Sequence, residues 1–231
     1  ATALSTISED MKSTIVTRYG IPEDKIEVIY NWGHEELKAH CESENIFLRK
    51  YPRKSGEFRV VYAGNLGKMQ NVEIVLEAAA LMENVPDITF YIVGGGANEE
   101  KLKAYAKEKA LSNVKFVGMQ PPEEVADLYA AADVNVIPLQ KGLIYAALPS
   151  KTADCLIAGK SIITCVDEES MFADLMKTLG FKNSDPQEAE ELRRLIVQTK
   201  ENIKVNYSNY GWKEVFSKKR NVSRHCLMIK K

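Results

Sequence analysis

Residues 58–96 decide the fold, and they read FRVVYAGNLGKMQNVEIVLEAAALMENVPDITFYIVGGG. Arg59–Ala63 and Thr89–Val93 are short runs that are apolar at nearly every position, which is typical of parallel strands covered on both faces. Between them, Asn71–Met82 carries apolar residues at helical spacing, with glutamates on the opposite face. The segment therefore predicts a strand, a helix and a second strand, with glycines directly after each strand.

The same alternation continues along the chain. Further strands are expected at Val114–Val117, Val134–Ile137 and Ser161–Val166, and further helices at Glu99–Ala110, Pro122–Ala131 and Ser150–Ala158. Strand–helix–strand units of this length form right-handed crossovers. The pattern predicts an α/β fold with a doubly wound, mainly parallel, Rossmann-like sheet.

The two ends of the chain extend this repeating region. An opening unit is expected over Leu4–Ile7, Glu9–Tyr19 and Ile26–Tyr30, followed by a polar connector to Glu57 with a short helix near Glu35–His40. Asp185 and Pro186 are expected to open a helix that runs to about Asn202, and Tyr207–Lys231 is basic and is expected to be helical in its first half. We thus divide the chain into a domain over residues 1–202 and a C-terminal helix or basic tail over 203–231. Within the domain, residues 1–57 hold the opening unit and connector, and residues 58–202 hold the main sheet.

Composition excludes several classes of protein. Basic and acidic residues number 31 and 32, so the net charge of −1 disfavours a nucleic-acid partner. The four cysteines are scattered without a C-x-x-C pair, which favours reduced thiols in a cytosolic protein, and the three histidines lack metal-ligand spacing, so no metal site is expected. No signal peptide and no apolar run of about 20 residues is present. Because the sequence begins without Met and runs at once into the expected strand, we expect the natural protein to begin upstream.

The loops after the strands hold the first candidate binding residues, because ligands of open parallel sheets bind beyond the carboxyl ends of the strands. Gly64, Asn65, Lys68 and Gln70 follow the first strand, where glycines, a lysine and helix amides suit a phosphate as well as they suit an ordinary turn.

Two further loops give weaker signals. Gly94 and Gly95 belong to a run that is not G-x-G-x-x-G, so we expect them to leave steric room at the cleft and not to bind a dinucleotide. Val117, Gly118 and Met119 could offer main-chain groups to a nucleotide base, although a plain loop is an equal interpretation.

The loop Leu139–Leu148 leads into the strongest candidate group. Ser150 is expected to cap the next helix, which would leave the amides of Lys151 and Thr152 directed toward the cleft. A lysine and Asp154 in an otherwise apolar helix carry a cost of burial that favours a functional role.

The order of these motifs resembles a known family. ISEDM (7–11), YGIP (19–22), KIEVIYN (25–31), VVYAGNLG (60–67), IVGGG (92–96), ADVNVIP (132–138) and AGKSII (158–163) together are similar to the C-terminal, donor-binding domain of family-four GT-B glycosyltransferases. The resemblance covers residues 1–202 and implies one half of a GT-B fold.

Carried over position by position, the resemblance implies particular roles. Asp154 stands at the second glutamate of the family's E-x(7)-E motif, which holds the ribose, and Ala146 stands where the first glutamate would contact the sugar. Asn65 and Gln70 replace the arginine and lysine that clamp the diphosphate. GNLGKMQ (64–70) and PSK (149–151) look like the exopolysaccharide, colanic-acid and N-acetylfucosaminyltransferase-like subgroup, in which Lys68 or Lys151 would supply the missing charge.

The implied activity is transfer of a sugar, with retained configuration, from a nucleoside-diphosphate sugar to an acceptor in cell-surface polysaccharide or glycolipid synthesis. UDP- or GDP-linked donors are favoured over ADP-linked ones, and no cofactor is expected. The acceptor domain of the family is not in this chain, so we expect the chain alone to bind nucleotide weakly and to transfer little sugar. We expect a cytoplasmic protein, with peripheral association at the inner membrane face as a further expectation for the full-length protein.

Two other functions remain open from the sequence. A nucleotide-sugar epimerase of GT-B type would need carboxylates and a histidine in the cleft, and the strand-end loops contain neither. A catalytically inactive, nucleotide-sugar-binding module is compatible with Ala146 and with the missing clamp residues. No catalytic residue is identified.

Overall fold

The computed structural model describes residues 3–202 and 211–229. Its main sheet has six strands in the order β5-β4-β3-β6-β7-β8, and all neighbouring strands are parallel. The strands are β3 (Phe58–Ala63), β4 (Ile88–Val93), β5 (Val114–Val117), β6 (Val134–Pro138), β7 (Ser161–Cys165) and β8 (Lys182–Ser184). Strand order reverses between β3 and β6, which is where such sheets bind ligands.

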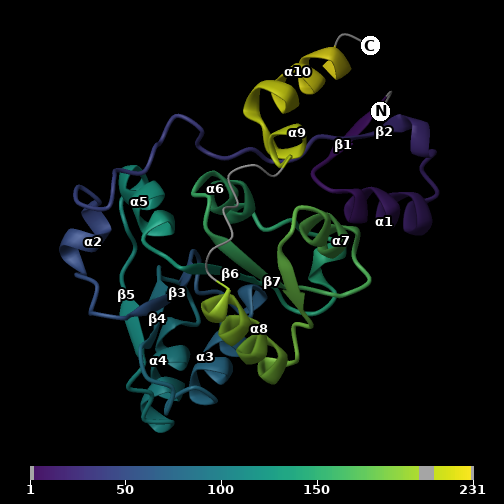
Figure 1. The fold of residues 1–231 in the computed structure, drawn as a ribbon. Helices are drawn as coiled ribbons and strands as arrows, with labels where there is room; N and C mark the ends of the chain where they lie inside the picture. The colour runs from purple at the N-terminus through teal and green to yellow at the C-terminus, as the bar shows by residue number, and fades with distance from the viewer. Residues whose placement is uncertain (1–2, 203–210, 230–231) are drawn as a thin grey trace.

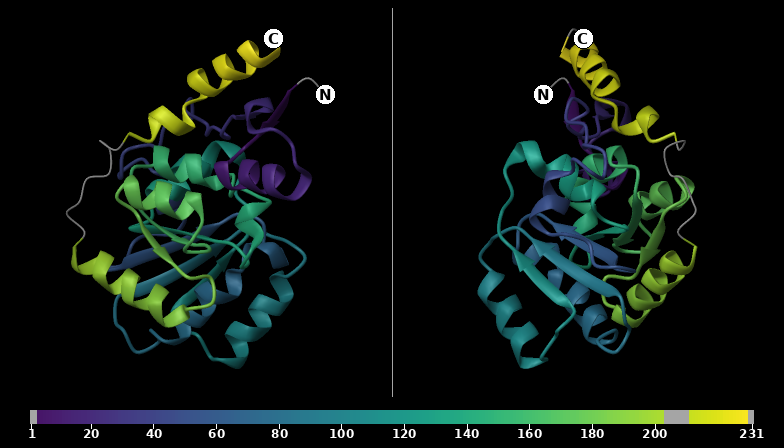
Figure 2. Two further views of the ribbon diagram at one scale, coloured as in Figure 1. Left: turned by 90° about the vertical axis from the view of Figure 1, so that its right-hand side faces the viewer. Right: turned by 60° about the vertical axis from the view of Figure 1, so that its left-hand side comes forward.

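Helices cover both faces of this sheet (Figures 1 and 2). One layer contains α3 (Val72–Ala80), α4 (Glu99–Glu108) and α8 (Ala189–Glu201). The opposite layer contains α2 (Ile46–Lys50), α5 (Val125–Ala130), α6 (Lys151–Ile157) and α7 (Met171–Thr178). Short 3-10 helices occupy Glu23–Lys25, Lys68–Gln70, Pro122–Glu124 and Leu143–Tyr145. The doubly wound, Rossmann-like α/β fold is confirmed.

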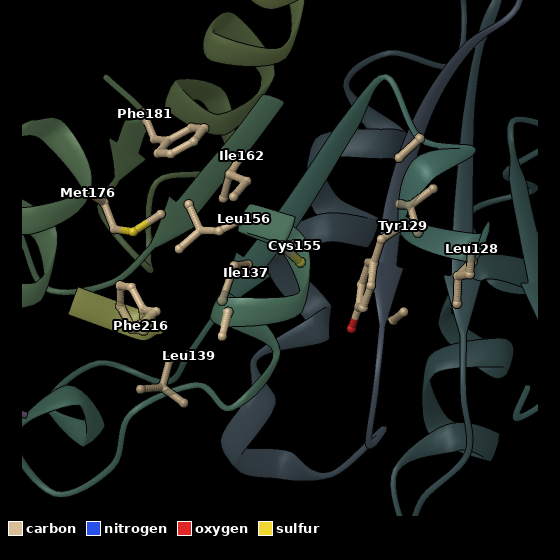
Figure 3. Packing of buried hydrophobic residues seen from close by; sticks show 14 of the residues in the cluster. Leu128, Tyr129, Ile137, Leu139, Cys155, Leu156, Ile162, Met176, Phe181 and Phe216 are labelled. Carbon is tan, nitrogen blue, oxygen red and sulfur yellow. The ribbon is translucent and has the colours of Figure 1, made fainter. Parts of the chain in front are cut away.

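Alternation along the strands explains the two layers. In β3, Val60 and Tyr62 join the hydrophobic cluster under α3, whereas Val61 and Ala63 join the cluster on the other face. Figure 3 shows part of the second cluster, in which residues of α5, α6 and α7 meet those of β6 and β7. Both faces of the sheet are therefore covered by helices, which leaves the ends of its strands as the place for a site.

The opening unit forms a small sheet of its own. β1 (Leu4–Thr6) pairs in parallel with β2 (Ile26–Val28), and α1 (Glu9–Tyr19) connects them. The buried carboxylate of Asp10 accepts hydrogen bonds from the amides of Met171 and Phe172 at 2.8 and 2.9 Å, which joins α1 to the start of α7. Burial raises the pKa of Asp10 despite these bonds.

Two C-terminal helices, α9 (Lys213–Phe216) and α10 (Lys218–Ile229), lie beside the opening unit (Figure 1). The Arg224 guanidinium donates to Glu27 in β2, with an Nε–Oε1 distance of 2.9 Å. No helix in the described part of the chain has the length and apolar character needed to cross a membrane.

Several sequence predictions need correction. No helix forms near Glu35–His40; the connector instead forms α2 ten residues later, where the side chain of Asn45 caps the amide of Leu48 at 2.8 Å. The Asp185 carboxylate accepts from the amide of Gln187 in a turn, so α8 begins only at Ala189. α7 and β8 were not predicted, and helix α10 extends into the second half of the tail. The predicted start of the tail, residues 203–210, lies outside the described residues.

Candidate functional site

A pocket of about 540 Å³ lies beyond the carboxyl ends of β3 and β6, and we call it the central pocket. It is large enough for a small-molecule ligand. Its lining consists of Asn31, Trp32, His34, Ala63, Gly64, Asn65, Gln70, Tyr129, Ser150, Lys151 and Asp154. Six predicted binding residues are thus brought together here, namely Gly64, Asn65, Gln70, Ser150, Lys151 and Asp154.

Lys151 gives this pocket its electrostatic character. Its Nζ is buried, has no hydrogen-bond partner among the described residues, and lies 4.0 Å from the centroid of the Tyr62 ring. Burial lowers the pKa of Lys151 to about 8. A Cβ at position 64 would lie 2.9 Å from this Nζ, so glycine there makes room for the cation. A buried ammonium group without a counterion costs free energy that a bound anion would offset.

Asp154 lies one turn further along α6 and contacts the connector. Its Oδ1 accepts from the backbone amide of His34 at 2.8 Å and lies 3.2 Å from the same residue's Nδ1. A Cβ at Gly33 would come within 2.7 Å of Oδ1, so only glycine allows the connector to pass this close to α6. The carboxylate therefore holds residues 33–34 at the wall of the central pocket.

A second carboxylate holds the next part of the connector. The buried Asp127 in α5 accepts from the amides of His40 and Ile46, both at 2.7 Å, and its Oδ2 lies 2.9 Å from His40 Nδ1. Burial alone would raise the pKa of Asp127, but the two amides and the His40 imidazole outweigh it and lower the pKa. Two aspartates thus fix the connector across α5 and α6.

A second hollow of about 310 Å³, the strand-tip pocket, adjoins the central pocket. The two pockets share Ala63, Gly64, Asn65 and Tyr129; the remaining lining is Val93, Gly94, Gly95, Met119, Gln120, Val125 and Leu128. Met119 is 77% exposed. Val117 is buried, and Val117 and Gly118 lie outside the lining. Of the predicted base-binding residues, Met119 alone lines this pocket.

Gly94 and Gly95, which the sequence predicted to leave steric room, differ in what lies beside them. A Cβ at Gly94 would lie 1.9 Å from the carbonyl oxygen of Gly64, so that space is filled by backbone. At Gly95 a Cβ would meet only the tip of the Glu99 side chain, at 3.4 Å. Room for a ligand is therefore found at Gly95 and not at Gly94.

Other candidate residues are placed differently from the sequence expectation. Lys68 is exposed and lies outside the linings of both pockets. Ser150 lines the central pocket, but its backbone is helical and its side chain makes no capping bond, so the predicted cap is wrong. The amide of Thr152 donates to the carbonyl of Pro149 at 3.1 Å and is not free for a ligand.

Sequence reasoning missed Trp32 and His34. Both line the central pocket, and Trp32 is 41% exposed. They follow β2 closely, as the other site loops follow their strands, but the polar composition of the connector indicated only a linker. Within residues 3–202 and 211–229, no group of three or more His, Cys, Asp or Glu side chains could hold a metal ion.

Comparisons with known sequences identify the family. The family described as glycosyl transferases group 1 matches residues 43–211, well over half of the chain. The chain belongs to this family and is a domain of a glycosyltransferase.

Two curated relatives are named as glycosyltransferases. The chain is 26% identical over 197 residues to the probable glycosyltransferase WbjE of Pseudomonas aeruginosa, covering 85% of this chain and 49% of that protein. It is 24% identical over 177 residues to the putative colanic acid biosynthesis glycosyl transferase WcaI of Escherichia coli K12, covering 76% and 43%. The chain spans about half the length of these curated relatives.

Solved structures share the fold. A glycosyltransferase from Rickettsia africae superposes with a TM-score of 0.80 at 15% identity, over 99% of this chain and 62% of that one. Anabaena Alr3699/HepE in complex with UDP and glucose gives a TM-score of 0.77 at 18% identity, over 100% and 63%. The fold is that of a C-terminal GT-B domain, as the motifs predicted.

Proposed function

We propose that this domain binds a nucleoside-diphosphate sugar, with the diphosphate seated on Lys151 in the central pocket. The observation that carries the proposal is the buried, unpartnered Nζ of Lys151 at the point where strand order reverses. A diphosphate would supply the missing negative charge, and a lysine ammonium is a common phosphate ligand. Gly64, Asn65, Gln70 and Ser150 line the same space and surround the proposed phosphate position.

The neighbouring features accommodate the rest of the nucleotide. The strand-tip pocket, with Met119 and Gly95 in its lining, offers an apolar space for the base beside the phosphate position. Asp154 lines the central pocket and supports the ribose site that the family resemblance implies. Anabaena HepE, which shares the fold, has been crystallised with UDP and with UDP-glucose, which supports a nucleotide-sugar donor; a UDP- or GDP-linked donor is part of the proposal.

The full-length protein, in this proposal, transfers the sugar with retention to an acceptor in cell-surface polysaccharide or glycolipid synthesis, and an N-terminal domain holds the acceptor. The bond between the anomeric carbon and the diphosphate oxygen breaks, and its electron pair stays on the diphosphate. The acceptor hydroxyl oxygen forms the new bond to the anomeric carbon, and its proton passes to the departing diphosphate. A fixed cation beside that oxygen stabilises the developing charge without reorganisation. The names of WbjE and WcaI support sugar transfer, and the name of WcaI, which refers to colanic acid biosynthesis, supports a polysaccharide product.

The replacement Lys151→Met tests the diphosphate site, because methionine keeps an unbranched side chain and removes the charge. We expect the affinity for UDP, or for GDP if GDP is the ligand, to fall about 10- to 100-fold, as for loss of a charge-assisted hydrogen bond. Isothermal titration calorimetry on the 231-residue chain measures this change.

Two lysine variants complete that experiment. Lys177→Met removes an exposed lysine on α7 that pairs with Glu168, and it should leave the affinity unchanged. Lys68→Met should also bind normally, since Lys68 lies outside both linings. A loss of affinity in Lys68→Met together with normal binding in Lys151→Met would move the phosphate site to the Lys68 loop and refute the proposal.

A catalytically inactive nucleotide-sugar-binding module is the second candidate, and the exposed Ala146 at the usual glutamate position favours it. Donor turnover by the full-length protein separates the two functions. The proposal also includes a cytoplasmic location at the inner membrane face, supported by the basic residues of α10. Sedimentation with anionic vesicles tests that part; no binding would remove it.

A further inference from the structure

The Asp154 carboxylate is already engaged by the protein. Its Oδ1 is within bonding distance of two nitrogens of His34, the backbone amide at 2.8 Å and Nδ1 at 3.2 Å, and Oδ2 lies 3.4 Å from the same Nδ1. The side chain of Asp154 is 19% exposed, whereas that of His34 is 63% exposed. Of this pair, the imidazole is the member that a ligand reaches first.

The imidazole also stands between two cavities. His34 and Asp154 line the central pocket, and both also line an outer pocket of about 240 Å³ between the connector, α5 and α6. The Asp154 carboxylate contacts both the backbone amide and the ring Nδ1 of His34, so it holds the backbone and the imidazole of this residue together. The close approach of Gly33 to Asp154 fixes the backbone before it.

The tautomer of the His34 imidazole determines which hydrogen bond its Nε2 atom can make. A neutral imidazole whose Nδ1–H donates to a carboxylate presents an acceptor lone pair at Nε2. In the part of the chain that the structure describes, Nε2 of His34 has no hydrogen-bond partner. A hydroxyl group that donates a hydrogen bond is the natural ligand for such an atom.

We propose that His34 is a donor-binding residue whose Nε2 accepts a hydrogen bond from a ribose hydroxyl of the nucleotide, and that Asp154 is the positioning residue that orients it. The inference rests on the proposed function, because it assigns the ribose contact within the same central pocket. An aspartate is one methylene shorter than a glutamate, and His34, which contacts this carboxylate and lines the same pocket, supplies a second polar group there. The arrangement is the same as that of a carboxylate orienting a functional histidine.

Paired nucleotides test the proposal. The 231-residue chain is titrated with UDP and with 2′,3′-dideoxy-UDP, or with the two corresponding guanine nucleotides if GDP is the ligand. The wild type should prefer the nucleotide with hydroxyls by about fivefold, the ratio that one hydrogen bond of ordinary net strength contributes. In His34→Ala this ratio should fall to about one, while binding of the dideoxy nucleotide is unchanged.

A direct contact between Asp154 and the ribose predicts the opposite sign. Removal of the His34 ring would expose the Asp154 oxygens, so His34→Ala would then keep or increase the preference for hydroxyls. That outcome overturns the proposal. Asp154→Ala should reduce the ratio, and Asp154→Asn should restore part of it, because an amide oxygen can still accept from His34. A ratio equally low in Asp154→Ala and Asp154→Asn would contradict the positioning role.

His40→Ala is the matched control, because His40 and Asp127 form a second histidine–aspartate pair on the same connector, outside the lining of the central pocket. It should retain the wild-type ratio, and thermal unfolding verifies that each variant is folded. If neither UDP nor GDP binds the wild type, the proposed function fails and the ribose contact fails with it. If nucleotide binds but His34→Ala keeps its preference, only the ribose contact fails.

Discussion

Two buried cations sit at opposite ends of strand β3, and each lies over a tyrosine ring. Near the start of the strand, Arg59 Cζ is 4.8 Å from the centroid of Tyr91. Beyond the end of the strand, Lys151 Nζ is 4.0 Å from the centroid of Tyr62. Both cations are removed from water, so the ring contact alone does not distinguish a structural cation from a ligand-binding one.

Their partners distinguish them. Arg59 donates from Nε to Glu57 Oε2 at 2.8 Å and from Nη2 to the carbonyl of Tyr51 at 2.8 Å, and Nη1 is its one unpartnered nitrogen among the described residues. Burial would raise the pKa of Glu57, but the bond and charge of Arg59, together with hydrogen bonds from Thr89 and the backbone of Lys54, outweigh burial and lower the pKa. Among the described residues, no carboxylate or carbonyl group bonds to Lys151 Nζ. The protein itself therefore supplies partners for the cation at the amino end of the sheet, whereas the cation at the carboxyl end is the one that we propose a ligand neutralises.

Arg59→Met should produce the largest effect, because it leaves the buried Glu57 without its counterion. We expect the free energy of unfolding to fall by about 3–5 kcal/mol, as measured by urea denaturation. Adding Glu57→Gln should restore part of the loss, since the uncompensated charge is removed. Lys151→Met, in contrast, should not destabilise the fold. If Arg59→Met and Lys151→Met lost equal amounts of unfolding free energy, both cations would have the same structural role and the comparison would be wrong.

The pH dependence of stability sharpens the comparison further. The pKa of Lys151 falls from 10.5 to about 8 on folding, so between these values the unfolded chain binds more protons than the folded chain. Stability contributed by this site therefore rises with pH across that window, by about 3 kcal/mol in total.

Urea denaturation at pH 7, 8.5 and 10, for the wild type and Lys151→Met, measures the effect as a difference. The wild type should gain stability relative to the variant as the pH rises. The contribution of the tyrosines to the pH dependence is the same in both proteins, so it cancels in the difference. A difference that stays constant over this range would show that Lys151 is not desolvated.

Much of the fold followed from the sequence because periodicity in one segment is a local property. β3, β4 and β5 appeared within about a residue of their expected bounds, and α1 at its expected bounds, since apolar runs and caps lie within the elements themselves. The path of the connector could not be predicted from local periodicity, because two distant aspartates, Asp127 and Asp154, determine it.

Part of the site was also predictable from the order of strands and loops. Gly64 directly follows β3 and Lys151 begins the helix after β6, and both were found because parallel strands bring their carboxyl ends to one edge. His34 and Trp32 were missed because their contribution depends on how the connector folds back over α6. The missing partner of Lys151 was likewise visible only once the neighbouring groups were placed.

The smallest effects concern the hydroxyl groups of the two tyrosines. The Tyr91 hydroxyl lies 3.2 Å from Glu57 Oε1 and 3.0 Å from Lys115 Nζ, so Tyr91→Phe breaks contacts with charged groups and should cost about 1.5–3 kcal/mol of unfolding free energy. The Tyr62 hydroxyl donates to the carbonyl of Asn65 at 2.6 Å, so Tyr62→Phe should cost about 1 kcal/mol. Because the ring under Lys151 remains, nucleotide affinity in Tyr62→Phe should be unchanged. Urea denaturation and calorimetric titration measure the two quantities, and a large loss of affinity in Tyr62→Phe would mean that the hydroxyl group, and not the ring, supports the cation.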